Sequence, residues 1–512
     1  MRKFFLSFFT LIIMISCVSV KKYNERLVTP ISPEKLKEDV DFTYKKLQEL
    51  HPNLYWYISK DSLDYKFDSL KTSLKKPLNP QEFSLELQSV IAKVKEGHLQ
   101  LSIPAKKLTK KESQKLKNQK GLFSRMNYVI SDDKIYVKDN AENFENIKVG
   151  TEIQKIQDIE AKKYLDRYKR LINSDGFNTT YQKYSMARRW ASYFTIENGI
   201  LDSVKITTKY NGDVKDFYIH REKMTKEQKK KDEDNNKKIT KSEKGKTKDF
   251  NPVTKSFNRD LQFLEKDSSV AYIKIKTFSG VYSSKFYKET FEKINKSHSK
   301  YLILDIRDNL GGSLAEINNL YSYLALDKFQ FLKDIEVTKK TSLLHANFFN
   351  QIPLLSKPIA VATYPIYFLG SLFSTKKSGD KFLLKNNNIF TIKNPKKTNF
   401  KGELYVLING SIFSASSIIS SKIKNDKRGI LVGEETGGAN DGSVAGRYST
   451  ETLPNSKIKL PIGLMLIKGN IEPTNTMKGV TPNVEIIPSL QEILQKKDPQ
   501  LDWVLKDIKA KK

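Results

Sequence analysis

The sequence predicts an α/β protein with a helical N-terminal region and a mixed α+β middle domain. Beyond about residue 256, apolar β-branched runs alternate with helical segments, which is typical of a mostly parallel, buried sheet. Between 32 and 105, capped segments with apolar residues at helical spacing indicate helices. A chain of 512 residues exceeds one ordinary domain, so we expect roughly two to four.

The first 17 residues, MRKFFLSFFTLIIMISC, carry two positive charges followed by an apolar run. The run is too short to remain as a membrane-spanning helix, so 1–17 is predicted to be a secretory signal. Cys17 is the only cysteine, and a small residue followed by Cys at this place resembles a bacterial lipoprotein cleavage box. We expect lipidation of Cys17, a tether over 18–31 and anchorage in the cell envelope, facing the periplasm or the cell surface. The alternative is a simple secretory signal with a chance cysteine.

The N-terminal region, 32–105, contains two clear helix starts. Ser32-Pro33-Glu34 combines an N-cap, a proline at the first helical position and an early acid, and Asn79-Pro80-Gln81-Glu82 forms a capping box. The second helix is predicted to stop at Gly97, before a short strand, LQLSI. This region therefore places His98 at a helix-to-strand corner.

The middle region, 123–221, has strand-like runs (KIYV, GTEIQKI, DSVKITTKY) around a helix near AKKYLDRYKRLI. The stretch VGTEIQKIQDIEAKKYL follows the order of a PDZ-like module: glycine turn, strand, polar turn, helix. A Lys-rich linker, 222–252, comes next, because 11 lysines and almost no apolar residues lie between 223 and 248.

The net charge of +32 raises the question of nucleic-acid binding. The excess is nearly all lysine spread along the chain, without an Arg-rich helix or a basic-aromatic repeat, so we interpret it as a solvated surface and expect no nucleic-acid partner. The sequence contains no metal-binding box, phosphate loop or dinucleotide fingerprint. We expect neither a metal nor a cofactor.

The region 256–490 is predicted to be the core domain, followed by a C-terminal helix or tail over 491–512. Its expected strands are SVAYIKIKTF, KYLILDIRDN, KPIAVAT, GELYVLIN and RGILVGEE. Ligands of such sheets bind beyond the carboxyl ends of the strands, where two turns fall. One turn contains Gly311 and Gly312. The other leads through Asn409 into Ser414 and Ala415 at a helix start.

Ser414 is either a nucleophile presented by a sharp turn or an ordinary helix N-cap. In the first case, the Ala415 N–H and an N–H of Gly311 or Gly312 are suited to stabilise an oxyanion, because glycine lets the backbone approach a ligand closely.

Five motifs in this order (GHLQL, LILDIRDNLGG, SIFSAS, GILVGEETGG, GVTPNVEI) resemble the tail-specific (carboxy-terminal processing) and tricorn-core family of serine peptidases. The resemblance implies a crotonase-like ββα catalytic core, hydrolysis of peptide bonds in polypeptides, and Ser414 as nucleophile. In the tail-specific branch a lysine is the base, but that position is Ala439 here. The sequence is therefore closer to the tricorn-like branch, which brings a histidine from far upstream.

By this resemblance His98 is the base, a role that suits the pKa of histidine. His51 is interpreted as a packing or capping residue. The resemblance implies Glu472 as the third catalytic residue, with Glu434 and Asp441 as rivals. The predicted function is a cell-envelope serine endopeptidase that forms an acyl-enzyme on Ser414. The alternative is a non-catalytic peptide- or lipophile-binding protein on the same fold. The oligomeric state stays open.

Overall fold

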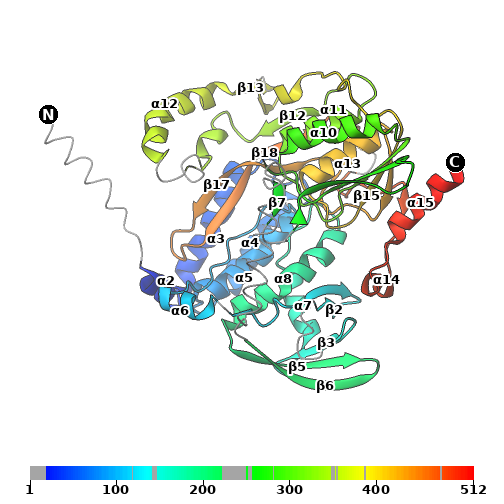
Figure 1. The fold of residues 1–512 in the computed structure, drawn as a ribbon. Coiled ribbons are helices and arrows are strands. Elements are labelled where there is room, and N and C mark those ends of the chain that lie inside the picture. Colours follow the sequence, from blue (N-terminus) through cyan, green and yellow to red (C-terminus); the bar gives the residue numbers. More distant parts are fainter. Residues whose placement is uncertain are drawn as a thin grey trace.

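The computed structural model describes residues 19–117, 119–140, 147–221, 249–251, 256–280, 282–347, 352, 356–385, 388–472 and 476–512. The predicted signal with Cys17 and the lysine-rich segment 223–248 lie outside these residues. Figure 1 shows the N-terminal helices on one side, the middle domain below and the core domain above it.

The N-terminal region is helical, as predicted, and contains more helices than expected. Its capping box at Asn79 and Glu82 is present at the start of α5. Residues expected to form a tether instead include helix α2, whose Leu27 is buried. The segment LQLSI makes only an isolated bridge, Ser102 with Lys459, so the predicted strand is wrong. The helices are α2 Val20–Val28, α3 Pro33–Leu50, α4 Lys60–Ser73, α5 Pro80–Ile91, η1 Ala92–Val94 and α6 Lys110–Leu116.

The middle region forms its own antiparallel sheet in the order β1-β2-β3-β5-β6, with β4 paired to β3. Helices α7 and α8 pack against this sheet over a separate core that includes Trp190. Helix α8 was not predicted from the sequence. The PDZ-like character of this region stays a prediction. The elements are β1 Asn127–Ser131, β2 Lys134–Asp139, β3 Glu152–Ile156, β4 Ile159–Glu160, α7 Ala161–Lys169, α8 Thr180–Asn198, β5 Ser203–Tyr210 and β6 Asp213–His220.

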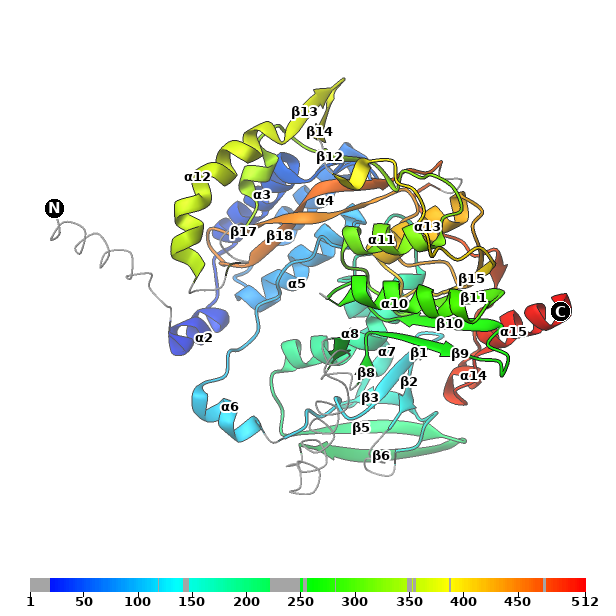
Figure 2. The ribbon, with the colours of Figure 1, turned by 45° about the horizontal axis from the view of Figure 1, so that its top comes forward.

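The core domain contains the predicted mostly parallel sheet, in the order β19-β16-β15-β11-β10-β9. Only β9 with β10 is antiparallel among these pairs. All five residues of β11 are buried, because α10, α11 and α13 cover one face and α15 covers the other (Figure 2). The elements are β9 Arg259–Phe263, β10 Val270–Ile275, α10 Ser283–Lys296, β11 Tyr301–Asp305, α11 Leu314–Leu324, β15 Glu403–Ile408, α13 Ala415–Asn425, β16 Ile430–Gly433, β19 Val484–Glu485, α14 Leu490–Leu494 and α15 Pro499–Lys511.

A second, antiparallel sheet in the order β13-β14-β12-β18-β17 was not predicted. The segment KPIAVAT, expected as a strand, belongs to helix α12, so that prediction is wrong. Pro358 stands in the first turn of this helix, where proline is favoured, and the apolar run continues to Phe373, longer than a strand. The remaining elements are β7 Phe250–Asn251, β8 Ser256–Phe257, β12 Leu332–Val337, η4 Ser342–His345, α12 Lys357–Phe373, β13 Thr375–Ser378, β14 Lys381–Leu384, η7 Asn388–Phe390, β17 Ser443–Thr452 and β18 Lys459–Gly469.

Candidate active site

Ser414 occupies the sharp turn between β15 and α13. Its backbone has φ 56° and ψ −126°, a conformation that a non-glycine residue adopts only under strain. Ser414 is the N-cap residue of α13, but its side chain makes no capping hydrogen bond. The interpretation of Ser414 as an ordinary helix cap therefore fails, and its hydroxyl is available for another role.

Access to solvent distinguishes Ser414 from the serines around it. Every residue from 404 to 423 is buried except Ser414, which is partly exposed. Ser416 and Ser417 have buried hydroxyls without a hydrogen-bond partner among the described residues. A substrate can therefore reach the Ser414 hydroxyl and none of its serine neighbours.

The glycine turn after β11 packs directly against Ser414. A Cβ added to Gly311, which has φ +104°, would lie 2.9 Å from the Ala415 nitrogen and 2.9 Å from Ser414 Cβ. The missing side chain thus leaves space beside the first N–H of α13, where an oxyanion needs a donor.

The two glycine N–H groups differ. The Gly311 N–H donates to Asn309 Oδ1 at 2.9 Å, so it is already engaged. For Gly312, no hydrogen bond from its N–H is found within the described part of the chain. Gly312 and Ala415 are therefore the better pair of candidate oxyanion donors.

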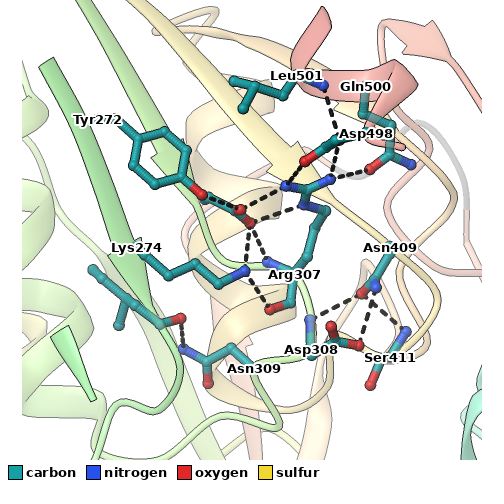
Figure 3. A network of polar contacts seen from close by, with 12 residues as sticks. Tyr272, Lys274, Arg307, Asp308, Asn309, Asn409, Ser411, Asp498, Gln500 and Leu501 are labelled. Carbon is teal, nitrogen blue, oxygen red and sulfur yellow. Dashed lines mark hydrogen bonds and ion pairs between the residues drawn. The ribbon is translucent and has the colours of Figure 1, made fainter. Parts of the chain in front are cut away.

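A polar network holds the two strand-end turns together (Figure 3). The Asp308 N–H donates to Asn409 Oδ1, and Asn409 Nδ2 donates to Asp308 Oδ1, each at 3.1 Å. Asn409 Oδ1 also accepts the Ser411 N–H at 3.2 Å. These bonds fix the turn that carries Gly311 relative to the turn that carries Ser414.

Arg307 anchors the same network on its other side. Its guanidinium binds Asp305 at the end of β11 and Asp498 just before α15, with nitrogen-to-oxygen distances of 2.7 Å to each (Figure 3). Burial raises the pKa of Asp305, but hydrogen bonds from Arg307 and the charge of Lys274 outweigh burial and hold this pKa below its ordinary value. Arg307 therefore ties the C-terminal helix to the strand ends and does not offer a free cation to a substrate.

His98 lies beside the serine turn. Its ring centroid is 4.9 Å from that of Phe413, the residue that precedes Ser414. A Cβ on Gly97 would overlap the Phe413 ring, so a glycine at this position allows the close approach. The structure thus brings together two segments that are more than 300 residues apart in sequence, as the proposed roles of His98 and Ser414 require.

The Nδ1 atom of His98 faces Glu96, with Oε1 at 3.1 Å, and also lies 3.3 Å from Ser443 Oγ. Burial would lower the pKa of His98, but the hydrogen bond and the charge of Glu96 outweigh it and raise this pKa above its ordinary value. Nε2 has no hydrogen-bond partner among the described residues. That atom is therefore the one left to exchange a proton with a serine hydroxyl.

Glu96 is buried between two histidines. His51 Nε2 is 3.8 Å from Glu96 Oε2 on the side opposite His98, and both residues are almost fully buried. Burial raises the pKa of Glu96, but its contacts with His51 and His98 outweigh burial and hold the pKa below its ordinary value. His51 is the buried C-cap residue of α3, as expected, and it also belongs to the polar cluster behind His98.

Asp175 completes this cluster. Its two carboxylate oxygens accept the Gly97 N–H at 2.7 Å and the Ala439 N–H at 3.1 Å. Burial, together with the nearby charge of Glu96, raises the pKa of Asp175 to about 7. Ala439, which stands where a related branch has a lysine, is thus bound through its backbone to the loop that carries His98.

Glu96, His98 and Asp175 also offer ligand atoms within 4.8 Å of one another, close enough for a metal ion. However, both Asp175 oxygens already accept backbone N–H groups and Glu96 binds His98. These hydrogen bonds account for the cluster without an ion.

The structure does not bring Glu472 to His98. Glu472 is exposed, and its N–H donates at 3.0 Å to Asn425, the last residue of α13. Helix α13 has 11 residues and is about 16 Å long, and Ser414 stands at its other end.

The two rivals of Glu472 have partners of their own. Glu434 accepts from Tyr184 Oη at 2.7 Å and from the Gly410 N–H at 3.1 Å, so it supports the serine turn. Asp441 accepts the Met477 N–H at 3.0 Å, and burial raises its pKa. Neither carboxylate contacts His98 in the described structure.

A cleft of about 1280 Å³ lies between the middle domain and the core and reaches Leu310 and Asn409, next to the glycine and serine turns. Its lining includes Tyr184 and Arg188 of α8. The cleft does not include Ser414 or His98, so it adjoins the candidate site without containing it. Its size suits an extended polypeptide segment better than a small metabolite.

Known proteins match both the core domain and the fold. Residues 269–486 match the model of peptidase family S41. None of the curated proteins matches the chain. The solved structure of mature CPAF complexed with lactacystin is 15% identical, with a TM-score of 0.61, over 93% of this chain and 98% of that one. Mature CPAF alone is 14% identical, with a TM-score of 0.57, over 91% and 94%.

A third structure, the photosystem II D1 C-terminal processing protease, is 13% identical over 91% of this chain and 97% of that chain, but its TM-score is only 0.41. At these identities the structural likeness to CPAF establishes the fold, and the family match carries the chemistry. The fold and this match define a serine-type peptidase with an α/β core. Over residues 269–486, the core domain is similar to peptidase family S41, the tail-specific and tricorn-core family.

Proposed function

We propose that this peptidase cleaves polypeptides through an acyl-enzyme on Ser414, with His98 as general base. One observation carries the proposal: the strained, accessible Ser414 directly follows Phe413, whose ring packs against a histidine whose Nδ1 is held by a buried carboxylate. This arrangement has the elements of a serine-histidine-acid triad.

The proposed reaction begins when Ser414 Oγ attacks the peptide carbonyl carbon and His98 Nε2 takes the hydroxyl proton. The N–H groups of Ala415 and Gly312 stabilise the oxyanion. His98 then gives the proton to the leaving amine as the C–N bond breaks. Water, deprotonated by His98, hydrolyses the acyl-enzyme and releases Ser414.

We assign the orienting role to Glu96 in place of Glu472. The Glu96 carboxylate contacts Nδ1, which fixes the tautomer that leaves Nε2 as proton acceptor, and its charge stabilises the imidazolium formed during the reaction. Asp175 positions the same loop through the Gly97 N–H.

Fluorophosphonate labelling tests the nucleophile directly. The chain should be labelled stoichiometrically at Ser414, and Ser414→Ala should lose the label. Ser421→Ala is a matched control, because Ser421 is a buried serine on the same helix. Absence of labelling on a chain that binds peptides would favour the binding-protein alternative, and labelling that survives Ser414→Ala would place the nucleophile elsewhere.

We further propose that the enzyme is anchored in the cell envelope through lipidated Cys17. The support is the apolar N-terminal run that ends at the only cysteine of the chain. Metabolic labelling with a fatty-acid analogue should mark the wild type and not Cys17→Ala. If both are labelled equally, or if Cys17→Ala stays in the membrane fraction after a high-salt wash, Cys17 is not the anchor.

A further inference from the structure

Helix α12 exposes an apolar surface that no other part of the described chain covers. Among its 17 residues only Lys357 is charged, and only Ala360 and Ser371 are buried. Ile359, Ile366 and Phe373 are 68%, 73% and 67% exposed. Soluble proteins rarely leave a continuous apolar face open to water, so α12 has a partner outside the chain as described.

The exposed apolar residues form one stripe along the helix. Ile359, Ile366 and Phe373 are spaced seven residues apart, and Leu369 falls between them at helical spacing. Two hydrogen bonds of Tyr367 hold the other side of the helix against the protein. Its Oη donates to the Leu343 carbonyl at 3.1 Å and accepts from Arg447 Nη1 at 3.2 Å. The helix is therefore fixed with its apolar stripe facing outward.

Lysines flank this stripe at both ends. From Val337 to Gly379 the chain has five lysines and no acidic residue. Lys357 begins the helix, and Lys376 and Lys377 follow it on β13, all three exposed. The partner of α12 must therefore offer an apolar region for the stripe and negative charge next to it for the flanking lysines.

This charge arrangement argues against a second copy of α12 as the partner. An antiparallel pair would place Lys357 against Lys376 or Lys377 of the other copy, and a parallel pair would place each lysine against its own counterpart. Like charges so placed repel. An anionic lipid surface offers both required features, because its headgroups are negative and its acyl region accepts apolar side chains.

The position of α12 is consistent with such a surface. Figures 1 and 2 show α12 on the same edge of the molecule as α2 and α6, away from the C-terminal helix α15. Helix α2 exposes Lys21 and Lys22, and α6 exposes Lys110 and Lys111. A plane along this edge would meet all three helices.

We propose that α12 lies flat on an anionic membrane, with Ile359, Ile366, Leu369 and Phe373 inserted among the acyl chains and the flanking lysines on the headgroups. No described helix is long and apolar enough to cross a membrane, so this contact is interfacial. The contact does not depend on Ser414 chemistry or on a lipid at Cys17. It orients the peptidase on the membrane.

The test uses the chain from Ser19 onward, which lacks Cys17 and keeps every buried residue of the described structure, since these begin at Leu27. Co-sedimentation is measured with phosphatidylcholine vesicles with and without phosphatidylglycerol. The chain should bind the anionic vesicles, and added salt should weaken binding. Neutralising Lys357 or Lys376 to Gln should each weaken binding about fivefold.

A double substitution, Ile366→Glu with Phe373→Glu, should abolish vesicle binding while leaving hydrolysis of a soluble peptide unchanged. Val214→Glu is the matched control, because Val214 is an exposed aliphatic residue on β6, in the middle domain (Figure 1). Equal binding by the double variant and the control would overturn the proposal. So would a dimer in sedimentation equilibrium that the double variant dissociates, because a second copy would then cover α12.

Discussion

At the scale of single residues, two features support Ser414 and His98 as the centre of the proposed site. Ser414 combines strained φ with access to solvent, and His98 has one nitrogen held by a buried carboxylate. The order of the motifs singled out both residues as candidates, and their catalytic roles stay predictions. Glu96 was missed, although it is only two residues before His98, in the loop that follows the same helical segment. Asp175 could not have been found in this way, because only tertiary packing brings it to residue 97.

The pH dependence of activity tests the role of Glu96. Glu96 raises the pKa of His98, and a base must be neutral to act, so the rise of kcat/KM with pH should be centred above 6.5, the ordinary value. Glu96→Gln removes the charge, so this limb should move to lower pH, and kcat should fall by about two orders of magnitude or more. If Glu96→Gln left the pH profile unchanged, the assignment of Glu96 as the residue that orients His98 would be contradicted, however large the loss in rate.

The Gly311 position tests the oxyanion site. In Gly311→Ala the added Cβ would crowd the Ala415 nitrogen at 2.9 Å and force alanine into φ +104°, so kcat should fall by about 100-fold or more. Gly370→Ala is the matched control, because nothing lies within 4 Å of its added Cβ. Steady-state kinetics on both variants, with circular dichroism to confirm folding, give the comparison. Wild-type kcat in Gly311→Ala would place the oxyanion elsewhere.

At the scale of elements, buried β-branched runs predicted β10, β11, β15 and β16, because a strand covered on both faces has to be apolar throughout. The same signal led to a wrong prediction at α12, where an apolar run is exposed and helical. The antiparallel sheet around β18 went unpredicted, although β13 with β14 and β17 with β18 are local hairpins and only β12 with β18 pairs over a long sequence separation. Helix α8 went unpredicted as well, although α8 lines the cleft beside the site.

Helix α5 leads through η1 into the loop that carries Glu96 and His98, and its capping box can be tested alone. Asn79→Ala leaves the first N–H groups of α5 without their acceptor and should lower the free energy of unfolding by about 1 kcal/mol. Thermal denaturation and hydrogen exchange at Gln81 and Glu82, whose N–H groups donate to the Asn79 side chain, measure the effect. Asn79→Asp should retain the cap. A loss in Asn79→Asp as large as that in Asn79→Ala would show that the side-chain cap is not the cause.

At the scale of the whole molecule, the proposed catalytic centre is assembled from three regions. The N-terminal helices supply His98 and Glu96, the segment before α8 supplies Asp175, and the core supplies Ser414 with its glycine turn. Phe413 packs in the core of the middle domain, so all three regions meet at the serine turn. The order of the motifs predicts that the segments carrying His98 and Ser414 meet. It does not predict which carboxylates lie next to His98, because tertiary packing decides that.

The most direct test of the central claim is a double-mutant cycle on His98 and Ser414. If the two residues act as a unit, His98→Ala and Ser414→Ala should each remove nearly all turnover of a polypeptide substrate, and the double variant should be hardly slower than either single variant. Multiplicative losses, or near wild-type turnover in His98→Ala, would contradict the proposal that His98 is the base for Ser414.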